Sequence, residues 1–202
     1  MVAIIDYGAG NILSVQKALD HIGCENVVTS DREVIMSADG AVLPGVGSFG
    51  DAMDNLHKNG LTQAVKNFMS SGRPFLGICL GLQVLFDSSE ESPDAAGLSV
   101  FSGKVRRFPA GIGLKIPQIG WNSIDYERGC PIFKGLPENP YVYFVHSYYL
   151  EASDESVVSA VAEYGVRYHA AVARGNVFAT QFHPEKSGEV GLQILRNFAE
   201  LI

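Results

Sequence analysis

The segment GRPFLGICLGLQVLF, residues Gly72–Phe86, indicates a sharp turn from a strand to a helix. A short apolar run at 74–76 leads into GICLG at Gly77–Gly81, which has the pattern glycine, any residue, nucleophile, any residue, glycine. In such a nucleophile elbow only glycine fits on either side of the nucleophile. Cys79 would then lie at the N-terminus of a helix, where backbone N–H groups and the helix dipole favour the thiolate. The alternative is a buried core cysteine between two closely packed glycines.

The residues before the elbow alternate between short apolar strands and amphipathic helices. Strands are predicted at 2–6, 27–29 and 40–43, and apolar residues recur at helical spacing over 12–22 and 51–69, with a break at Gly60. This alternation predicts an α/β fold with a mostly parallel central sheet flanked by helices.

The residues after the elbow change in character. Helical periodicity is lost over 98–118, and strands are predicted at 119–122, 141–149, 157–163, 167–173 and 178–183, before a closing helix at 190–201. This pattern predicts a smaller, antiparallel addition to the sheet. At 202 residues the chain fits one domain, 1–202.

Composition narrows the range of partners. The net charge of −7 argues against binding of nucleic acid or an anionic membrane, because both depend on clustered Lys and Arg.

No apolar run reaches the ~18–20 residues that span a bilayer, and the N-terminus lacks the charged region of a signal peptide. Cys24, Cys79 and Cys130 are too widely spaced for a disulfide framework or a CxxC metal pair. We therefore expect a cytoplasmic protein with no metal.

A glycine-rich loop follows the strand predicted at 40–43. Its sequence, GVGSFG at Gly45–Gly50, matches the GxGxxG pattern of dinucleotide sites. A proline precedes the first glycine, however, and no acidic residue lies ~20 residues further on to hold a ribose. The glycines more simply provide a loop whose backbone N–H groups can turn toward a ligand.

A thiol nucleophile needs a base, and the base needs a partner that orients it. His183 lies at the end of the last predicted strand, in TQFHPE at 180–185, where sites assemble in α/β sheets. Glu185, two residues on, can point to the same side and accept a hydrogen bond from the imidazole. The alternative is a capping histidine beside a surface glutamate.

Three segments resemble, in order and spacing, the signatures of class I glutamine amidotransferases: PGVG at 44–47, GICLGLQ at 77–83 and FHPE at 182–185. The resemblance covers residues 1–202 and implies a flavodoxin-like fold. It also implies that the protein hydrolyses L-glutamine through a cysteine thioester, without a cofactor. It implies a triad of Cys79, His183 and Glu185. The residues it implies for the oxyanion and the substrate are Val46, Gly47, Leu80, Gln83, Ser147 and Tyr148.

Three further segments, DYGAGN at 6–11, KIPQIGWN at 115–122 and HPEKSG at 183–188, resemble the family of glutaminase subunits of imidazole glycerol phosphate synthase. Gln118 departs from that family, in which a histidine is expected. The resemblance implies a heterodimer with a (β/α)₈-barrel cyclase that uses the ammonia in histidine biosynthesis. Trp121, Asn122 and Lys186 are candidates for the docking face, the alternative being ordinary packing and a solvated lysine.

Three other functions stay open at this point. The chain could serve another synthase, such as that of pyridoxal phosphate or anthranilate, although the GWN sequence at 120–122 argues against it. It could be a cysteine peptidase or a thiol-based chaperone on a similar sheet. It could also be a silent scaffold, which the presence of Cys79, His183 and Glu185 disfavours.

Overall fold

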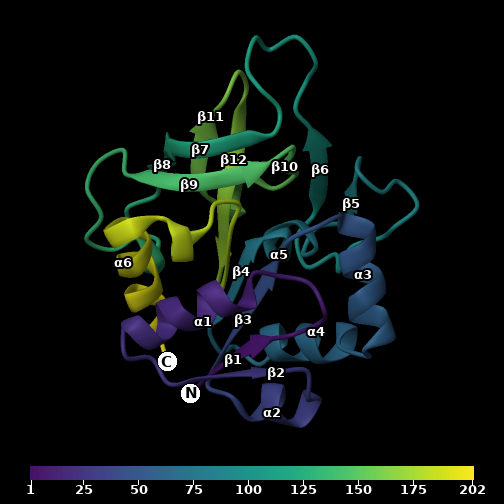
Figure 1. The fold of residues 1–202 in the computed structure, drawn as a ribbon, viewed down its shortest axis with the longest axis vertical. Coiled ribbons are helices and arrows are strands. Elements are labelled where there is room, and N and C mark those ends of the chain that lie inside the picture. Colours follow the sequence, from purple (N-terminus) through teal and green to yellow (C-terminus); the bar gives the residue numbers. More distant parts are fainter.

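The computed structural model describes residues 1–202 and confirms the α/β fold, with one large sheet and one small one (Figure 1). The strands of the large sheet are β1 Val2–Ile5, β2 Asn26–Thr29, β3 Gly40–Gly45, β4 Phe75–Cys79, β5 Ser88–Ser89, β6 Gly103–Arg107, β8 Asp125–Tyr126, β10 Tyr148–Ala152, β11 Val158–Glu163, β12 Arg167–Arg174 and β13 Val177–Thr180. Their order is β2-β1-β3-β4-β13-β12-β10-β6-β5, with β11 beside β12 and β8 beside β11. From β2 to β13 the neighbours are parallel, and β12 is antiparallel to β13, β10 and β11.

The small sheet pairs β7 Gln118–Ser123 with β9 Tyr141–His146 in antiparallel fashion. The helices are α1 Ile12–His21, α2 Arg32–Ser37, α3 Phe49–Lys58, α4 Thr62–Ser70, α5 Leu80–Gln83 and α6 Gly188–Ala199, with 3₁₀ turns η1 Pro131–Phe133, η2 Glu155–Val157 and η3 Pro184–Lys186. None of these helices has the length and hydropathy needed to span a membrane.

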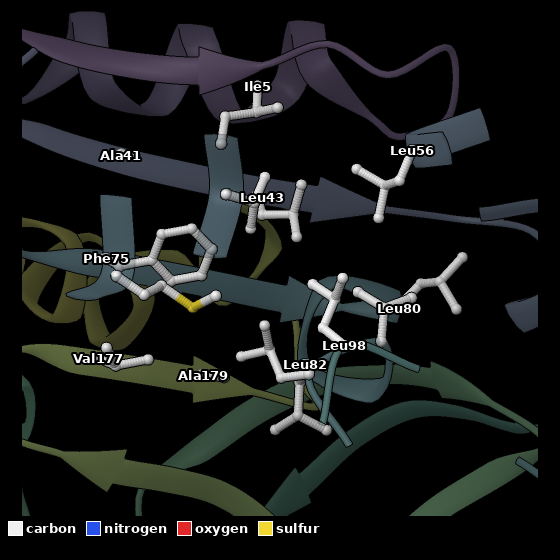
Figure 2. Packing of buried hydrophobic residues seen from close by; sticks show 14 of the residues in the cluster. Ile5, Ala41, Leu43, Leu56, Phe75, Leu80, Leu82, Leu98, Val177 and Ala179 are labelled. Carbon is white, nitrogen blue, oxygen red and sulfur yellow. The ribbon is translucent and has the colours of Figure 1, made fainter. Parts of the chain in front are cut away.

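The parallel part of the large sheet is buried on both faces. Successive side chains of a strand point to opposite faces, so Ala3 and Ile5 of β1 join one apolar cluster while Val2 and Ile4 join the other. The first cluster includes residues of α2, α3, α4 and α5, and Figure 2 shows part of it. The second cluster includes residues of α1 and α6. The sheet therefore lies between two layers of helices, as expected for a parallel sheet.

The strand predicted over 141–149 is in fact two strands in two different sheets. β9 ends at His146 in the small sheet and β10 begins at Tyr148 in the large one, with Ser147 between them. The backbone N–H of Phe108 donates to the carbonyl of Ser147 (3.1 Å). An apolar, aromatic run cannot reveal this change of sheet, because both halves have the same strand pattern.

The strand predicted over 178–183 also ends earlier than expected. β13 stops at Thr180, and the backbone N–H of Gln181 then donates to Ala170 (2.8 Å), while that of His183 donates to Tyr143 of β9 (2.9 Å). His183 is therefore held between the two sheets and begins the η3 turn.

The elbow after β4 confirms the predicted turn from strand to helix. Cys79 has φ +56°, an unusual value for a residue other than glycine. A Cβ atom on Gly81 would lie 1.9 Å from the carbonyl oxygen of Leu43, and one on Gly77 would lie 2.7 Å from that of Gly81. The elbow backbone thus packs directly on β3. The following helix, α5, is only four residues long, so its dipole favours a thiolate less than a long helix would.

We expect Gly81→Ala to lower the free energy of unfolding by about 3 kcal/mol or more, because the added methyl group meets a backbone carbonyl that cannot move aside. Denaturant unfolding measures this change. Gly129→Ala is the matched control, since its nearest atom would be a side-chain oxygen 3.7 Å away, and it should cost no more than about 1 kcal/mol. Equal effects of the two substitutions would contradict the packing argument.

Candidate active site

A pocket of about 300 Å³ lies at the carboxyl ends of β3 and β4, beside the junction of β9 and β10. Ligand sites in α/β sheets form at this end of the strands. Eight residues predicted from the sequence line it: Val46, Gly47, Cys79, Leu80, Gln83, Ser147, Tyr148 and His183. Four further residues that were not predicted also line it: Glu91, Pro117, Val145 and His146. The pocket therefore brings together segments from the whole length of the chain.

The predicted histidine–carboxylate pair is present and almost completely buried. Nδ1 of His183 lies 2.7 Å from Oε1 of Glu185, and the two side chains are only 2% and 1% exposed. Because Nδ1 donates its hydrogen to the carboxylate, Nε2 is the nitrogen that can exchange a proton with the pocket. Nε2 has no hydrogen-bond partner within the protein. Glu185 does not line the pocket and lies behind the imidazole.

The proton of His183 depends on the nearby thiol as well as on Glu185. Burial lowers the pKa of His183, whereas the adjacent Cys79 and the hydrogen-bonded Glu185 raise it, and the balance raises the pKa to about 10. A protonated imidazole is then favoured beside Cys79. Such an imidazolium can donate a proton to a group bound in the pocket.

Gln83 is joined to Cys79 through a buried residue that sequence reasoning missed. Nε2 of Gln83 donates to the carbonyl of Tyr148 (3.2 Å) and to Oε1 of Gln181 (3.0 Å). Nε2 of Gln181 in turn donates to Sγ of Cys79 (3.7 Å). One signal could have revealed it: Gln181 precedes His183 by two residues, so an extended backbone points both side chains to the same side.

His146 is a second residue missed from the sequence. Its Nδ1 lies 2.8 Å from the carbonyl of Tyr148, and its Nε2 lies 3.4 Å from the hydroxyl of Tyr168. That hydroxyl donates to Oε1 of Gln118 (2.9 Å). Burial lowers the pKa of His146 to about 4. The imidazole is therefore neutral near pH 7, and it supports the pocket wall without adding charge.

The glycine loop after β3 lies next to Cys79. Gly45, the last residue of β3, pairs with Cys79 in the sheet, which places Val46 and Gly47 at the pocket. Gly47 has φ +105°, a conformation that favours glycine. The missed residue Glu91 accepts a hydrogen bond from the backbone N–H of Phe49 just after this loop (2.8 Å). Its position in the polar, acidic segment 88–93 was the available signal.

The three docking candidates differ in their surroundings. Trp121 is 56% exposed on β7, near Gly188 of α6, and Lys186 is exposed on η3. The side chain of Asn122 is instead bound within the protein, because its Nδ2 donates to the carbonyl of Glu163 (2.8 Å). No group of three or more His, Cys, Asp or Glu side chains in the chain is arranged to hold a metal ion.

Comparison with known proteins identifies the family. The model of the family "Glutamine amidotransferase class-I" matches residues 3–201. An imidazole glycerol phosphate synthase subunit HisH from Syntrophotalea carbinolica is 53% identical over 206 residues, covering 100% of both chains. One of the same name from Moorella thermoacetica is 51% identical over 201 residues, covering 100% of this chain and 95% of the relative. The solved structure of PurLQS from Thermotoga maritima shares the fold, with 19% identity and a TM-score of 0.78 over 98% of this chain and 97% of that one.

The buried, neutral His146 should make the protein sensitive to acid. Its folded pKa of about 4 lies below the unfolded value of 6.5, so its contribution is complete above pH 6.5 and is lost as pH falls toward 4. We expect this loss to reach about 3 kcal/mol. Denaturant unfolding between pH 7 and pH 4 should show a shallower decline for His146→Gln than for the unsubstituted protein. Substitution of the exposed His21 by Gln is the control and should leave the decline unchanged.

Proposed function

The chain belongs to the class-I glutamine amidotransferases and to the family of imidazole glycerol phosphate synthase subunits HisH, and from this we propose that Cys79, His183 and Glu185 carry out its glutamine hydrolysis. The observation that carries the proposal is the elbow thiol in one pocket with a buried imidazole that is bound to a carboxylate. It is the arrangement that a thiol nucleophile needs.

In the proposed reaction the Cys79 thiolate attacks the side-chain amide carbon of glutamine. The backbone N–H of Leu80 and those of Val46 and Gly47 stabilise the oxyanion that forms. His183 gives its proton to the leaving nitrogen, ammonia departs, and a glutamyl thioester remains on Cys79. His183 then takes a proton from water, which attacks the thioester and releases glutamate and the free thiolate.

The rest of the pocket suits the amino-acid end of glutamine. Glu91 offers a carboxylate to the α-ammonium group, and it is the acidic residue on the pocket wall. The Ser147 and Tyr148 segment is proposed to bind the α-carboxylate. Gln83 uses its Nε2 within the protein, so its Oε1 is left to accept a hydrogen bond from the substrate.

The chain is a subunit of a synthase complex, and we propose that its partner is a (β/α)₈-barrel cyclase that receives the ammonia. The support is an exposed apolar face on β7 and β9, where Ile119, Trp121 and Tyr141 are 62%, 56% and 60% exposed. Large exposed apolar side chains that gather on one face are typical of a protein interface. Val145 of β9 lines the pocket, so this face adjoins the site where ammonia would form.

Lys186 extends this docking face in our proposal, whereas Asn122 supports it through its bond to β11. We also propose that residues 1–202 work as a single domain in the cytoplasm. The two apolar clusters share the strands of one sheet, which supports a single cooperative unit.

Cys79→Ala in the complex should abolish glutamine-dependent synthesis, by a factor of at least about 1000, because no other group can form the thioester. Synthesis supplied with ammonium salts should stay within about twofold of the unsubstituted complex. Product formation from each nitrogen source measures both. Cys24→Ala, at a half-buried cysteine outside the pocket, is the control for both activities. Loss of both activities in Cys79→Ala would indicate a structural role for this residue.

Trp121→Ala should weaken binding to the cyclase by about 2 kcal/mol or more, roughly 30-fold, because exposed tryptophans at interfaces contribute strongly to affinity. Titration calorimetry measures the dissociation constant. Ile202→Ala is the matched control: it removes another exposed apolar residue, near Gly40 at the opposite end of β3. Equal affinities for Trp121→Ala and Ile202→Ala would place the docking face elsewhere.

A further inference from the structure

The Tyr148 carbonyl and the side-chain amides of Gln83 and Gln181 form a buried series of hydrogen bonds. The Tyr148 carbonyl fixes which end of each amide donates and which accepts. The carbonyl of Tyr148 can only accept, so the atom of Gln83 that faces it must be Nε2. The same Nε2 faces Gln181, which must therefore present Oε1 to it. The other end of the Gln181 amide, the end that faces Sγ of Cys79, must then be the donor. No other orientation of the two amides leaves every contact satisfied.

Gln181 is fully buried and held by hydrogen bonds from both its side chain and its backbone. The residue is 0% exposed, and both polar atoms of its side chain are used in the contacts with Gln83 and Cys79. Its backbone N–H is tied to Ala170 of β12 (2.8 Å). A buried amide with both ends satisfied has a defined orientation, because any rotation would leave a donor or acceptor without a partner.

We propose that Gln181 is a positioning residue that couples the nucleophile to substrate recognition. Its Nε2 holds the sulfur of Cys79 and favours the thiolate, while its Oε1 holds the amide of Gln83 in the orientation that turns the Gln83 oxygen toward the substrate. The proposal rests on the glutaminase mechanism above. It adds a residue outside the triad that acts on both Cys79 and Gln83.

The two bonds of Gln181 can be separated by substitution. Gln181→Met keeps a similar volume and loses both bonds. Gln181→Glu keeps an oxygen for Gln83 but places a second oxygen, with negative charge, against the sulfur. Both variants should disfavour the thiolate, and only Gln181→Met should also release the Gln83 amide.

The first measurement is the rate of alkylation of Cys79 by iodoacetamide against pH, followed by mass spectrometry of the Cys79 peptide in the full-length protein. We expect the midpoint of this profile to rise by at least about 0.5 pH units in Gln181→Met and by about 1 unit or more in Gln181→Glu. Asn197→Asp is the matched control, because Asn197 is another buried amide that donates to two carbonyls, those of Ile132 and Lys134. It should lower the melting temperature without moving the midpoint.

The second measurement is glutamate release by the complex with the cyclase. Gln181→Glu should lower kcat about 100-fold with KM for glutamine within about threefold, whereas Gln181→Met should lower kcat and also raise KM by about tenfold or more. The proposal is overturned if both folded variants keep the midpoint within 0.3 pH units and kcat/KM within threefold. Alkylation requires no glutamine. A complex without glutaminase activity would therefore overturn the proposed function, while the pH profile would still test the bond between Gln181 and Cys79.

Discussion

Direct contact between two backbones is the constraint on which the site depends. The elbow packs on β3 with no side chain between them, because a Cβ on Gly81 or on Gly45 would collide with the facing segment. This contact sets the distance from Cys79 to the loop of Val46 and Gly47, which continues directly from β3. The positions of the thiol and of the backbone donors beside it thus follow from a sheet register, which is more rigid than a set of side-chain contacts.

Around that backbone the protein buries two connected sets of polar groups. His183 with Glu185 forms one set, and the amides of Gln83 and Gln181 with the Tyr148 carbonyl form another. Burial of such groups costs free energy unless they are bonded to one another, so each set has a defined geometry. The thiol of Cys79 lies where the two sets meet. A thiol placed between two rigid polar sets needs little reorganisation if charge develops on it, as the proposed mechanism requires.

The parts of the site that depend on local pattern could be predicted from the sequence. The elbow follows from two glycines around Cys79, and the pair of His183 and Glu185 follows from spacing near a strand end. Local signals pointed to Gln181 and Glu91 but not to His146, and the contacts of all three could not be predicted, because they join residues distant in the sequence. The change of sheet at Ser147 was hidden for the same reason: nothing local distinguishes a strand that continues from one that joins a second sheet.

The position of β13 in the sheet has a consequence for the order of assembly. This strand lies between β4 and β12, near the middle of the large sheet, yet it begins at Val177 of 202 residues. While the chain emerges from the ribosome, β4 has an open edge until β13, about 100 residues further along, has been synthesised. Closing that gap requires pairing across about 100 residues, which is slow in folding. The same event brings His183 to the pocket of Cys79, so the proposed pair of thiol and base forms only when the sheet is complete.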